Sequence, residues 1–294
     1  MQDIRDTINK KAKIVEKTLE NLINSFQPVI ADTLFESMKY SLFSGGKRLR
    51  PILSMLSAEM TGGDQDKACK IGSALEMIHT YSLIHDDLPS MDDDTYRRGK
   101  KANHIVYGPG RAILAGDGLL TASFQLISEM DLEAEKLIKI IQVISKGAGV
   151  NGMVGGQVLD LESEGKKISL SELKKIHLAK TAALFESAIL AGAYTGNPDD
   201  NEIKALKTYS EKLGLLFQIT DDILDVTGDE AKLGKAIGSD SKLDKSTYPK
   251  LMGLDGAKEE AEKMVKEAKE SLALFGEKSH LFKSLLDFVL IRDH

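Results

Sequence analysis

The 294-residue sequence predicts an all-α protein, and three observations carry this prediction. Apolar residues recur every three or four positions, which is the period of an amphipathic helix. The six prolines, at 28, 51, 89, 109, 198 and 249, stand where these patterns begin or break, because the proline ring cannot continue a helix. Alternating runs of β-branched residues, which would indicate strands, are nearly absent. We therefore expect roughly ten helices, given typical helix lengths.

Three helices can be placed in order along the first third of the chain. An apolar stripe from Ile4 to Leu22 marks the first. A second follows the basic segment 44–51 and ends at Gly62–Gly63, because glycine adopts the left-handed backbone of a helix C-terminus at little cost. The third pattern starts at Asp64 and runs to Asp86, where Pro89 should distort it.

Two further helices follow in the second half of the chain. Ser169 and Glu172 have the spacing of a capping box, which opens a helix through Leu190. A later apolar stripe runs from Leu206 to Ile223. No low-complexity linker divides the chain, and a hydrophobic content of 42% supplies a large core. We therefore expect residues 1–294 to form a single domain.

Composition argues against several classes of protein. The net charge of -6 does not favour binding to nucleic acid or to an anionic membrane. The first residues are polar and periodic, unlike a secretory signal, and no apolar run is long enough to span a membrane. Cys69 is the single cysteine, so it cannot form an intramolecular disulfide, as expected of a reduced cytosolic protein. We expect a cytoplasmic location.

A first acidic cluster follows the helix that starts at Asp64. It consists of five aspartates within nine residues, at 86, 87, 92, 93 and 94. His79, Ser82 and Asp86 share one helix face. A solvated acidic turn is one interpretation of such a run. The other is a site where carboxylates hold a diphosphate through bridging magnesium, since Mg²⁺ prefers oxygen ligands and phosphate. Arg97 and Arg98, which follow directly, favour the second interpretation because guanidinium groups bind phosphate.

A second acidic cluster lies 135 residues further on, inside an apolar helical pattern. Gln218, Asp221, Asp222 and Asp225 form one polar stripe there. Burying unpaired carboxylates is strongly unfavourable, so the pattern calls for a metal or another cationic partner. A structural ion-pair network is the alternative. Two clusters of similar form indicate a shared metal-diphosphate site.

Basic residues gather in the segment SGGKRLRP at 44–51. Lys47, Arg48 and Arg50 stand beside two glycines ahead of an apolar helix, which suits a phosphate-binding corner. The segment is not a Walker loop, because no serine or threonine follows Gly46-Lys47. An ordinary charged helix start is the alternative. Lys180-Thr181 and Lys235 are further candidates, and each is weak alone.

Taken together, GGKRLRP, the spacing of Asp86 and Asp92 before Arg97-Arg98, Lys180-Thr181 and FQITDDILD resemble the trans-prenyltransferases. The pattern closely matches the bacterial farnesyl diphosphate synthases among them. The resemblance implies the isoprenoid synthase fold, a helical bundle with one acidic cluster on each wall of a central cavity. It also implies a homodimer, and condensation of isopentenyl diphosphate with dimethylallyl and then geranyl diphosphate.

The resemblance further assigns roles to individual residues. It implies about three magnesium ions that bridge the allylic diphosphate, as is usual for Mg²⁺ at phosphates. They would be held by Asp86, Asp92, Asp221 and Asp225. The same diphosphate would contact Arg97, Lys180 and Lys235, and isopentenyl diphosphate would contact Lys47, Arg50, His79 and Arg98. The allylic carbocation would be stabilised by the Lys180 carbonyl, the Thr181 hydroxyl and the Gln218 amide.

Product length should depend on what fills the cavity below the first cluster. By resemblance Tyr81, with Ser82 beside it, closes this cavity after a fifteen-carbon product. Ideal helix geometry puts Tyr81 about 140° around the helix from Asp86, so this placement rests on the resemblance. A core aromatic is the alternative role for Tyr81. The chain end, with Arg292, is expected to fold over the substrates.

Other functions also fit parts of the sequence. A geranylgeranyl or geranyl diphosphate synthase differs only in product length. A helical di-iron protein would use Glu-x-x-His pairs such as Glu76–His79 and Glu277–His280, but the second pair follows Gly276 in an expected loop. His85-Asp86 is similar to a phosphohydrolase dyad, a pair that is common by chance. A regulatory, non-enzymatic prenyl synthase subunit should lack an acidic cluster, and both clusters are present here.

Overall fold

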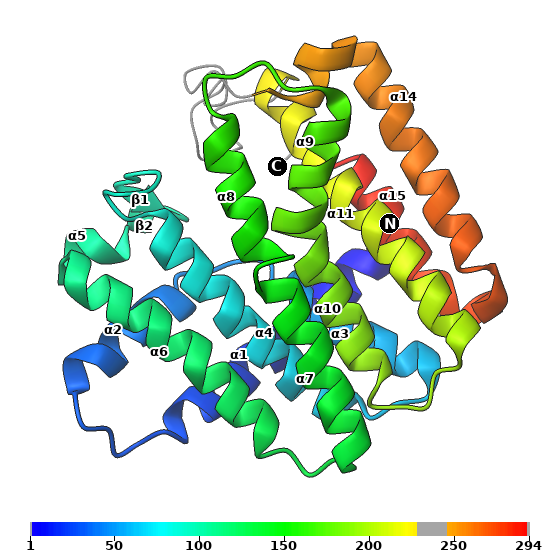
Figure 1. Cartoon of the computed structure of the whole chain (residues 1–294). Helices are drawn as coiled ribbons and strands as arrows, with labels where there is room; N and C mark the ends of the chain where they lie inside the picture. Colours follow the sequence, from blue (N-terminus) through cyan, green and yellow to red (C-terminus); the bar gives the residue numbers. More distant parts are fainter. Residues whose placement is uncertain (1, 228–245, 293–294) are drawn as a thin grey trace.

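The prediction of an all-α protein is confirmed by a computed structural model, which describes residues 2–227 and 246–292. The helices are α1 (Gln2–Asn24), α2 (Asp32–Leu42), α3 (Leu49–Thr61), α4 (Gln65–Asp86), α5 (Asn103–Tyr107), α6 (Pro109–Ser128), α7 (Ala134–Ala148), α8 (Met153–Ser163), α9 (Leu170–His177), α10 (Ala183–Ala193), α11 (Asp200–Thr227), α14 (Tyr248–Ser271) and α15 (His280–Leu290). Within the described ranges, the one sheet is an antiparallel pair of short strands, β1 (Tyr96–Arg97) and β2 (Lys100–Lys101). Figure 1 shows the helices packed side by side along most of the molecule.

Local sequence chemistry determines where several helices begin and end. Helix α3 ends at Thr61, and Gly62 follows with φ at 71°. The Asp64 side chain accepts hydrogen bonds from the backbone N–H of Asp66 and Lys67, which caps the first turn of α4. The capping box of Ser169 and Glu172 opens α9 as predicted. These boundaries follow from the residues at the helix ends.

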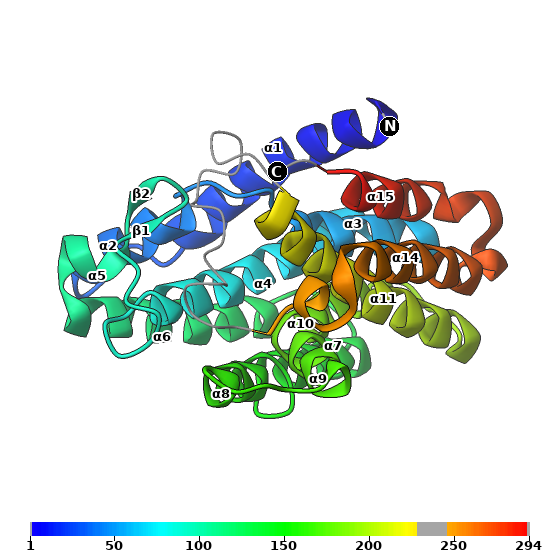
Figure 2. The same cartoon turned by 90° about the horizontal axis from the view of Figure 1, so that it is seen from above.

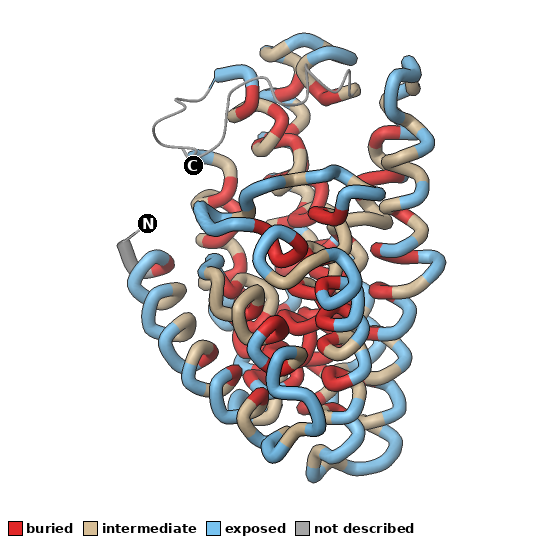
Figure 3. The backbone as a smooth tube through the Cα atoms, turned by 90° about the vertical axis from the view of Figure 1, so that its left-hand side faces the viewer, coloured by how far each residue is buried: buried red, intermediate tan, exposed pale blue. Residues whose placement is uncertain are grey.

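Helices α4 and α10 lie at the centre of the bundle. Helix α4 packs against α1, α2, α3, α6 and α10, while α10 packs against α3, α7 and α11. Figure 2 shows both helices between α1 and α15 on one side and α7 to α9 on the other. Buried residues follow the middle of the bundle in Figure 3. At Gly192 a side chain would lie 2.1 Å from the Ser54 carbonyl oxygen, so glycine there lets α10 approach α3 closely.

The helix predicted from Ser169 to Leu190 is interrupted. Helix α9 passes into η1 (Leu178–Ala182), a five-residue π-helix, before α10 continues. A π-turn inserts an extra residue into the helix and occurs often at functional sites. Lys180 and Thr181 lie in this widened turn.

In the described part of the chain, no helix combines the length and the apolar character required to cross a lipid bilayer.

Candidate active site

A cavity of about 370 Å³ opens beside the end of α4, and we call it the main cavity. Its walls come from α3, α4, α8 and η1. It brings together seven residues that the sequence had singled out: Arg50, His79, Tyr81, Ser82, Asp86, Lys180 and Thr181. Tyr81 and Asp86 therefore face one cavity despite their angular separation on an ideal helix.

The first acidic cluster reaches this cavity through Asp86, which lines it. Asp86 is the last residue of α4, and its backbone carbonyl accepts a hydrogen bond from the Asp92 N–H at 2.9 Å, which folds the cluster into a turn. Burial raises the pKa of Asp86 to about 6; nearby Lys180 opposes this rise and Asp92 adds to it. Since the charge of Asp92 acts on Asp86, a cation near both carboxylates would stabilise their ionised forms.

Asp87 and Arg97 have a different role in the same turn. Asp87 is buried and accepts hydrogen bonds from the Arg97 guanidinium, including one from Nε at 2.7 Å. Arg97 also donates to Asp94 at 2.7 Å. The guanidinium thus braces the acidic turn, and its contact with an allylic diphosphate stays a prediction.

The second acidic cluster borders a separate hollow of about 210 Å³, which we call the acidic pocket. Gln218, Asp221 and Asp222 of α11 line it together with Lys180. The Asp222 carboxylate accepts a hydrogen bond from the Tyr248 N–H at 2.8 Å and so caps α14. Asp225 is buried one turn later. Asp221 and Asp225 remain the predicted metal ligands, while Asp222 has a structural contact.

Lys180 connects the two hollows, since it lines both. Its Nζ lies 2.6 Å from Asp160 Oδ2 on α8. The neighbouring Thr181 hydroxyl donates to Gln218 Oε1 at 3.0 Å, which ties the π-turn to α11. The predicted catalytic groups therefore form one connected set between the acidic clusters.

Helix α8 can reach this π-turn because of a glycine. An added Cβ at Gly156 would lie 2.2 Å from the Lys180 backbone nitrogen, so a larger residue would push the helices apart. Gly156, Gln157 and Asp160 belong to the site and are not among the residues predicted from the sequence. The run GGQVLD at 155–160 was the available signal, because paired glycines inside a helix indicate a close backbone approach.

The basic corner is anchored by Arg48, which the sequence analysis did not separate from its neighbours. Arg48 is 2% exposed, and its guanidinium contacts Glu16 at 2.7 Å, Glu76 at 3.1 Å and the Leu42 carbonyl at 2.6 Å. These contacts join the corner to α1, α2 and α4. Arg48 therefore supports the corner rather than facing a ligand.

Arg50 and His79 lie together below this anchor. The Arg50 guanidinium stacks over the Phe185 ring at 5.0 Å, and burial lowers its pKa to about 10. Burial also holds the pKa of His79 well below its ordinary value, and the charges of Arg50 and Arg98 add to this effect. His79 is therefore neutral at pH 7 and can offer only a hydrogen bond to an anion.

Arg98 connects the first acidic turn to the basic corner. Its guanidinium donates to the Gly45 carbonyl, and a Cβ at Gly46 would lie 2.7 Å from Arg98 Nη1. Gly45 and Gly46 adopt φ of 102° and 127°, a backbone that favours glycine, and the missing side chain of Gly46 also leaves room for this arginine. Lys47 is exposed and lines a neighbouring hollow rather than the main cavity.

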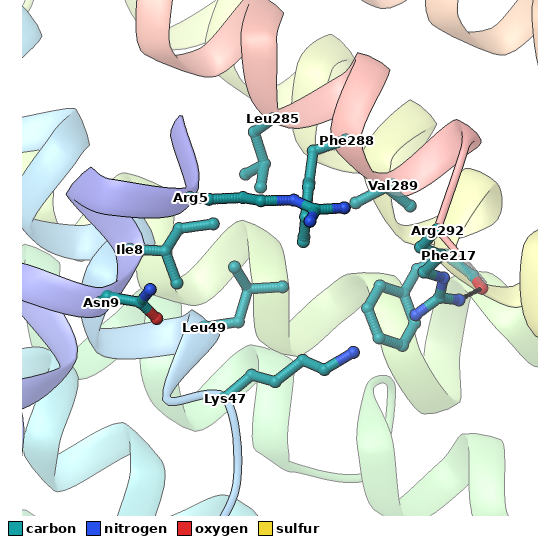
Figure 4. A pocket seen from close by; sticks show the side chains of 10 residues that line it. All are labelled: Arg5, Ile8, Asn9, Lys47, Leu49, Phe217, Leu285, Phe288, Val289 and Arg292. Atoms are coloured by element: carbon teal, nitrogen blue, oxygen red, sulfur yellow. Dashed lines mark hydrogen bonds between the residues drawn. The ribbon is translucent and has the colours of Figure 1, made fainter. Parts of the chain in front are cut away.

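That hollow, of about 250 Å³, lies between α1, α15 and the start of α3. Figure 4 shows the side chains of Arg5, Lys47 and Arg292 converging on it. Arg292 stacks on the Phe217 ring at 4.0 Å and donates to Asp221 Oδ1 at 2.7 Å. Arg292 therefore lies against the second acidic cluster, and folding of the chain end over the substrates stays a prediction.

Lys235, the remaining predicted ligand of the allylic diphosphate, lies outside the described residues. Across residues 2–227 and 246–292, no three histidine, cysteine, aspartate or glutamate side chains converge to form a site for a metal ion. The donor set nevertheless fits magnesium, which commonly takes one or two carboxylates and completes its shell with water and substrate phosphate.

Comparison with known proteins agrees with this geometry. The sequence profile of the family described as "Polyprenyl synthetase" matches residues 31–282. The chain is 45% identical over 284 residues to the farnesyl diphosphate synthase of Bacillus subtilis (strain 168), covering 95% of this chain and 96% of that protein. It is 43% identical over 288 residues to the geranylgeranyl diphosphate synthase of Cyanophora paradoxa, covering 97% and 95%. Among solved structures, a geranylgeranyl pyrophosphate synthetase from Pyrococcus horikoshii Ot3 matches with a TM-score of 0.89 at 32% identity, covering 99% of each chain.

Proposed function

Because the chain belongs to the polyprenyl synthetase family and is a trans-prenyl diphosphate synthase, we propose that its product is (2E,6E)-farnesyl diphosphate. The substrates are isopentenyl diphosphate with dimethylallyl and then geranyl diphosphate. The observation that carries the product length is Tyr81, which is 7% exposed and lines the main cavity five residues before Asp86. In this proposal, the bulky ring of Tyr81 closes the cavity to a further five-carbon unit.

Geranylgeranyl diphosphate is the alternative product. Relatives named for either product match at similar identity, so overall similarity does not separate the two. The position of Tyr81 favours the shorter product.

We assign the metal to the two acidic clusters. Asp86 and Asp92 on one side, with Asp221 and Asp225 on the other, would hold about three magnesium ions against the allylic diphosphate. When bound, these ions neutralise the diphosphate as it becomes a leaving group. Arg97, Lys180 and Lys235 contribute fixed positive charge to the same diphosphate.

The basic corner binds the second substrate. Lys47, Arg50 and Arg98 supply positive charge for isopentenyl diphosphate, and neutral His79 supplies a hydrogen bond. Arg48 holds the corner in place through its contacts with the partly exposed Glu16 and the buried Glu76.

Polar groups of the π-turn and of α11 then stabilise the charge that develops during the reaction. The allylic C–O bond breaks, and the electron pair leaves with diphosphate. The Lys180 carbonyl, the Thr181 hydroxyl and the Gln218 amide face the resulting carbocation, and preorganised dipoles of this kind stabilise developing charge without reorganisation. The isopentenyl double bond attacks this carbon, and the new cation loses a proton to the released diphosphate.

Incubation with labelled isopentenyl diphosphate and either dimethylallyl or geranyl diphosphate tests the product assignment. We expect a fifteen-carbon product from both starters. Tyr81→Ala should extend the product to twenty carbons, because the cavity gains the volume of the ring. A wild-type enzyme that makes mainly a twenty-carbon product would overturn the assignment to farnesyl diphosphate and the role of Tyr81.

We also propose that residues 1–294 act as one domain and that two copies form a homodimer. Exposed apolar side chains gather on α5 and α6, at Ile105, Val106, Ile113 and Leu114, which is unusual for a surface that stays in water. Light scattering after size-exclusion chromatography should give twice the chain mass of 32.1 kDa. A monomer mass would contradict this assembly.

A further inference from the structure

Tyr81 can limit product length only if its ring is held still across the main cavity. The structure provides a contact that does so. His85 follows Tyr81 by one helical turn on α4, and the two rings meet edge to face, with centroids 5.5 Å apart and planes at 79°. Such aromatic pairs contribute stability beyond the area that they bury. His85 also lines the main cavity itself.

The imidazole of His85 is in turn seated on α6. Its Nε2 lies 3.1 Å from the Ile113 carbonyl oxygen and 3.9 Å from Asp117 Oδ1. An added Cβ at Gly116 would lie 2.2 Å from that same nitrogen. Glycine is therefore required beneath the ring, and the backbone of α6 forms a seat that fits an imidazole.

We propose that His85 is a specificity-determining positioning residue, which fixes the Tyr81 ring across the main cavity and thereby limits product length. This inference rests on the proposed function and adds a second residue to its chain-length gate. His85 takes part in no proton transfer in this role. Its ring matters because it contacts both Tyr81 and α6, and so links the Tyr81 ring to a fixed backbone.

A double-mutant cycle of His85 and Tyr81 separates this positioning role from a simple increase in cavity volume when the His85 ring is removed. Removing the His85 ring should free Tyr81, so His85→Ala should raise the ratio of twenty-carbon to fifteen-carbon product about tenfold, or ~1.4 kcal/mol. His85→Phe keeps an aromatic edge and should stay within about threefold of the wild type. If His85 acts through Tyr81, then His85→Ala should change the ratio by less than about twofold in a Tyr81→Ala background.

Two results would overturn the inference. One is an unchanged product ratio in His85→Ala. The other is full additivity, in which His85→Ala raises the ratio about tenfold with or without Tyr81, since the imidazole would then act only as filler. His85→Asn, which keeps a hydrogen-bond donor but no ring, is the second variant if His85→Ala fails to fold. It should lengthen the product in the same way.

A binding measurement makes the test independent of turnover. Calorimetry with the unreactive farnesyl and geranylgeranyl thiolodiphosphates gives the preference of each variant for the longer chain. His85→Ala should shift this preference toward the longer analogue by about tenfold, and His85→Phe should not. Asp117→Asn is the matched control, because its carboxylate is mostly exposed and more distant from the ring. Failure of the wild type to condense its substrates would refute the proposed function, whereas an unchanged preference in His85→Ala would refute only the role of His85.

Discussion

Replacing Glu76 with glutamine should loosen the basic corner through a single buried contact. Arg48 and Glu76 are each 2% exposed, with 3.1 Å between Nη1 and Oε1. At that distance two unit charges attract by about 5 kcal/mol if the effective dielectric constant is about 20. Glutamine keeps the hydrogen bond, and the loss of a buried charge returns part of the desolvation cost. We therefore expect the free energy of unfolding to fall by about 2–3 kcal/mol.

Thermal unfolding followed by circular dichroism measures this loss, with an expected fall in Tm of roughly 3–5 °C for a chain of 294 residues. The KM for isopentenyl diphosphate should rise more than kcat falls, because Lys47 and Arg50 flank the anchored Arg48. Glu59→Gln is the matched control, since Glu59 pairs with Lys11 at 3.3 Å but is about half exposed. That change should cost about 0.5 kcal/mol or less. Equal decreases in Tm for Glu76→Gln and Glu59→Gln would refute the claim that the buried Arg48–Glu76 contact stabilises the fold more than an exposed pair.

Three further variants test the acidic clusters and the π-turn. The pKa of Asp86 is about 6 in the folded chain against an ordinary 3.8, so the folded state binds this proton more tightly. Wild-type stability should therefore rise as pH falls from about 6 toward 4. Asp86→Asn should raise Tm at pH 7.5 and abolish condensation. An unchanged Tm in this variant would argue against a buried charge at Asp86. Thr181→Val should lower kcat about 10- to 100-fold with little change in KM, and Thr181→Ser should keep most of the wild-type kcat. Full activity in Thr181→Val would exclude the hydroxyl from catalysis. Arg292→Ala removes the cation that contacts Asp221. In this variant, the magnesium concentration needed to raise Tm in the presence of a bisphosphonate should be about threefold lower than in the wild type. A higher magnesium requirement than that of the wild type would mean that Arg292 assists metal binding.

The sequence predicted those parts of the fold that depend on neighbouring residues. The end of α3 at Gly62 and the capping box at Ser169 depend on local backbone chemistry, which a short window contains. The shared face of His79, Ser82 and Asp86 follows from helical period alone, and all three line the main cavity. Local rules were sufficient for each of these features.

Contacts between distant segments could not be predicted in the same way. Arg48 and Lys47 are adjacent basic residues in the sequence, and nothing local indicates that Arg48 meets Glu16, 32 positions earlier. In the sequence, Asp222 cannot be distinguished from its neighbour Asp221. In the structure, the Tyr248 N–H, 26 residues away, donates a hydrogen bond to Asp222. The π-turn at Lys180 packs against Gly156 and α11, and such contacts between distant segments cannot be predicted from helical periodicity. Tertiary packing determined these roles.

The most direct test of the metal-diphosphate site is condensation of dimethylallyl and isopentenyl diphosphates with and without magnesium. Products are dephosphorylated and separated by carbon number, and the wild type is compared with a double variant, Asp86→Asn with Asp221→Asn. A fifteen-carbon product that requires magnesium, and that disappears in the double variant, is the predicted result. Condensation that persists in excess chelator or in the double variant would contradict the role given to the two acidic clusters.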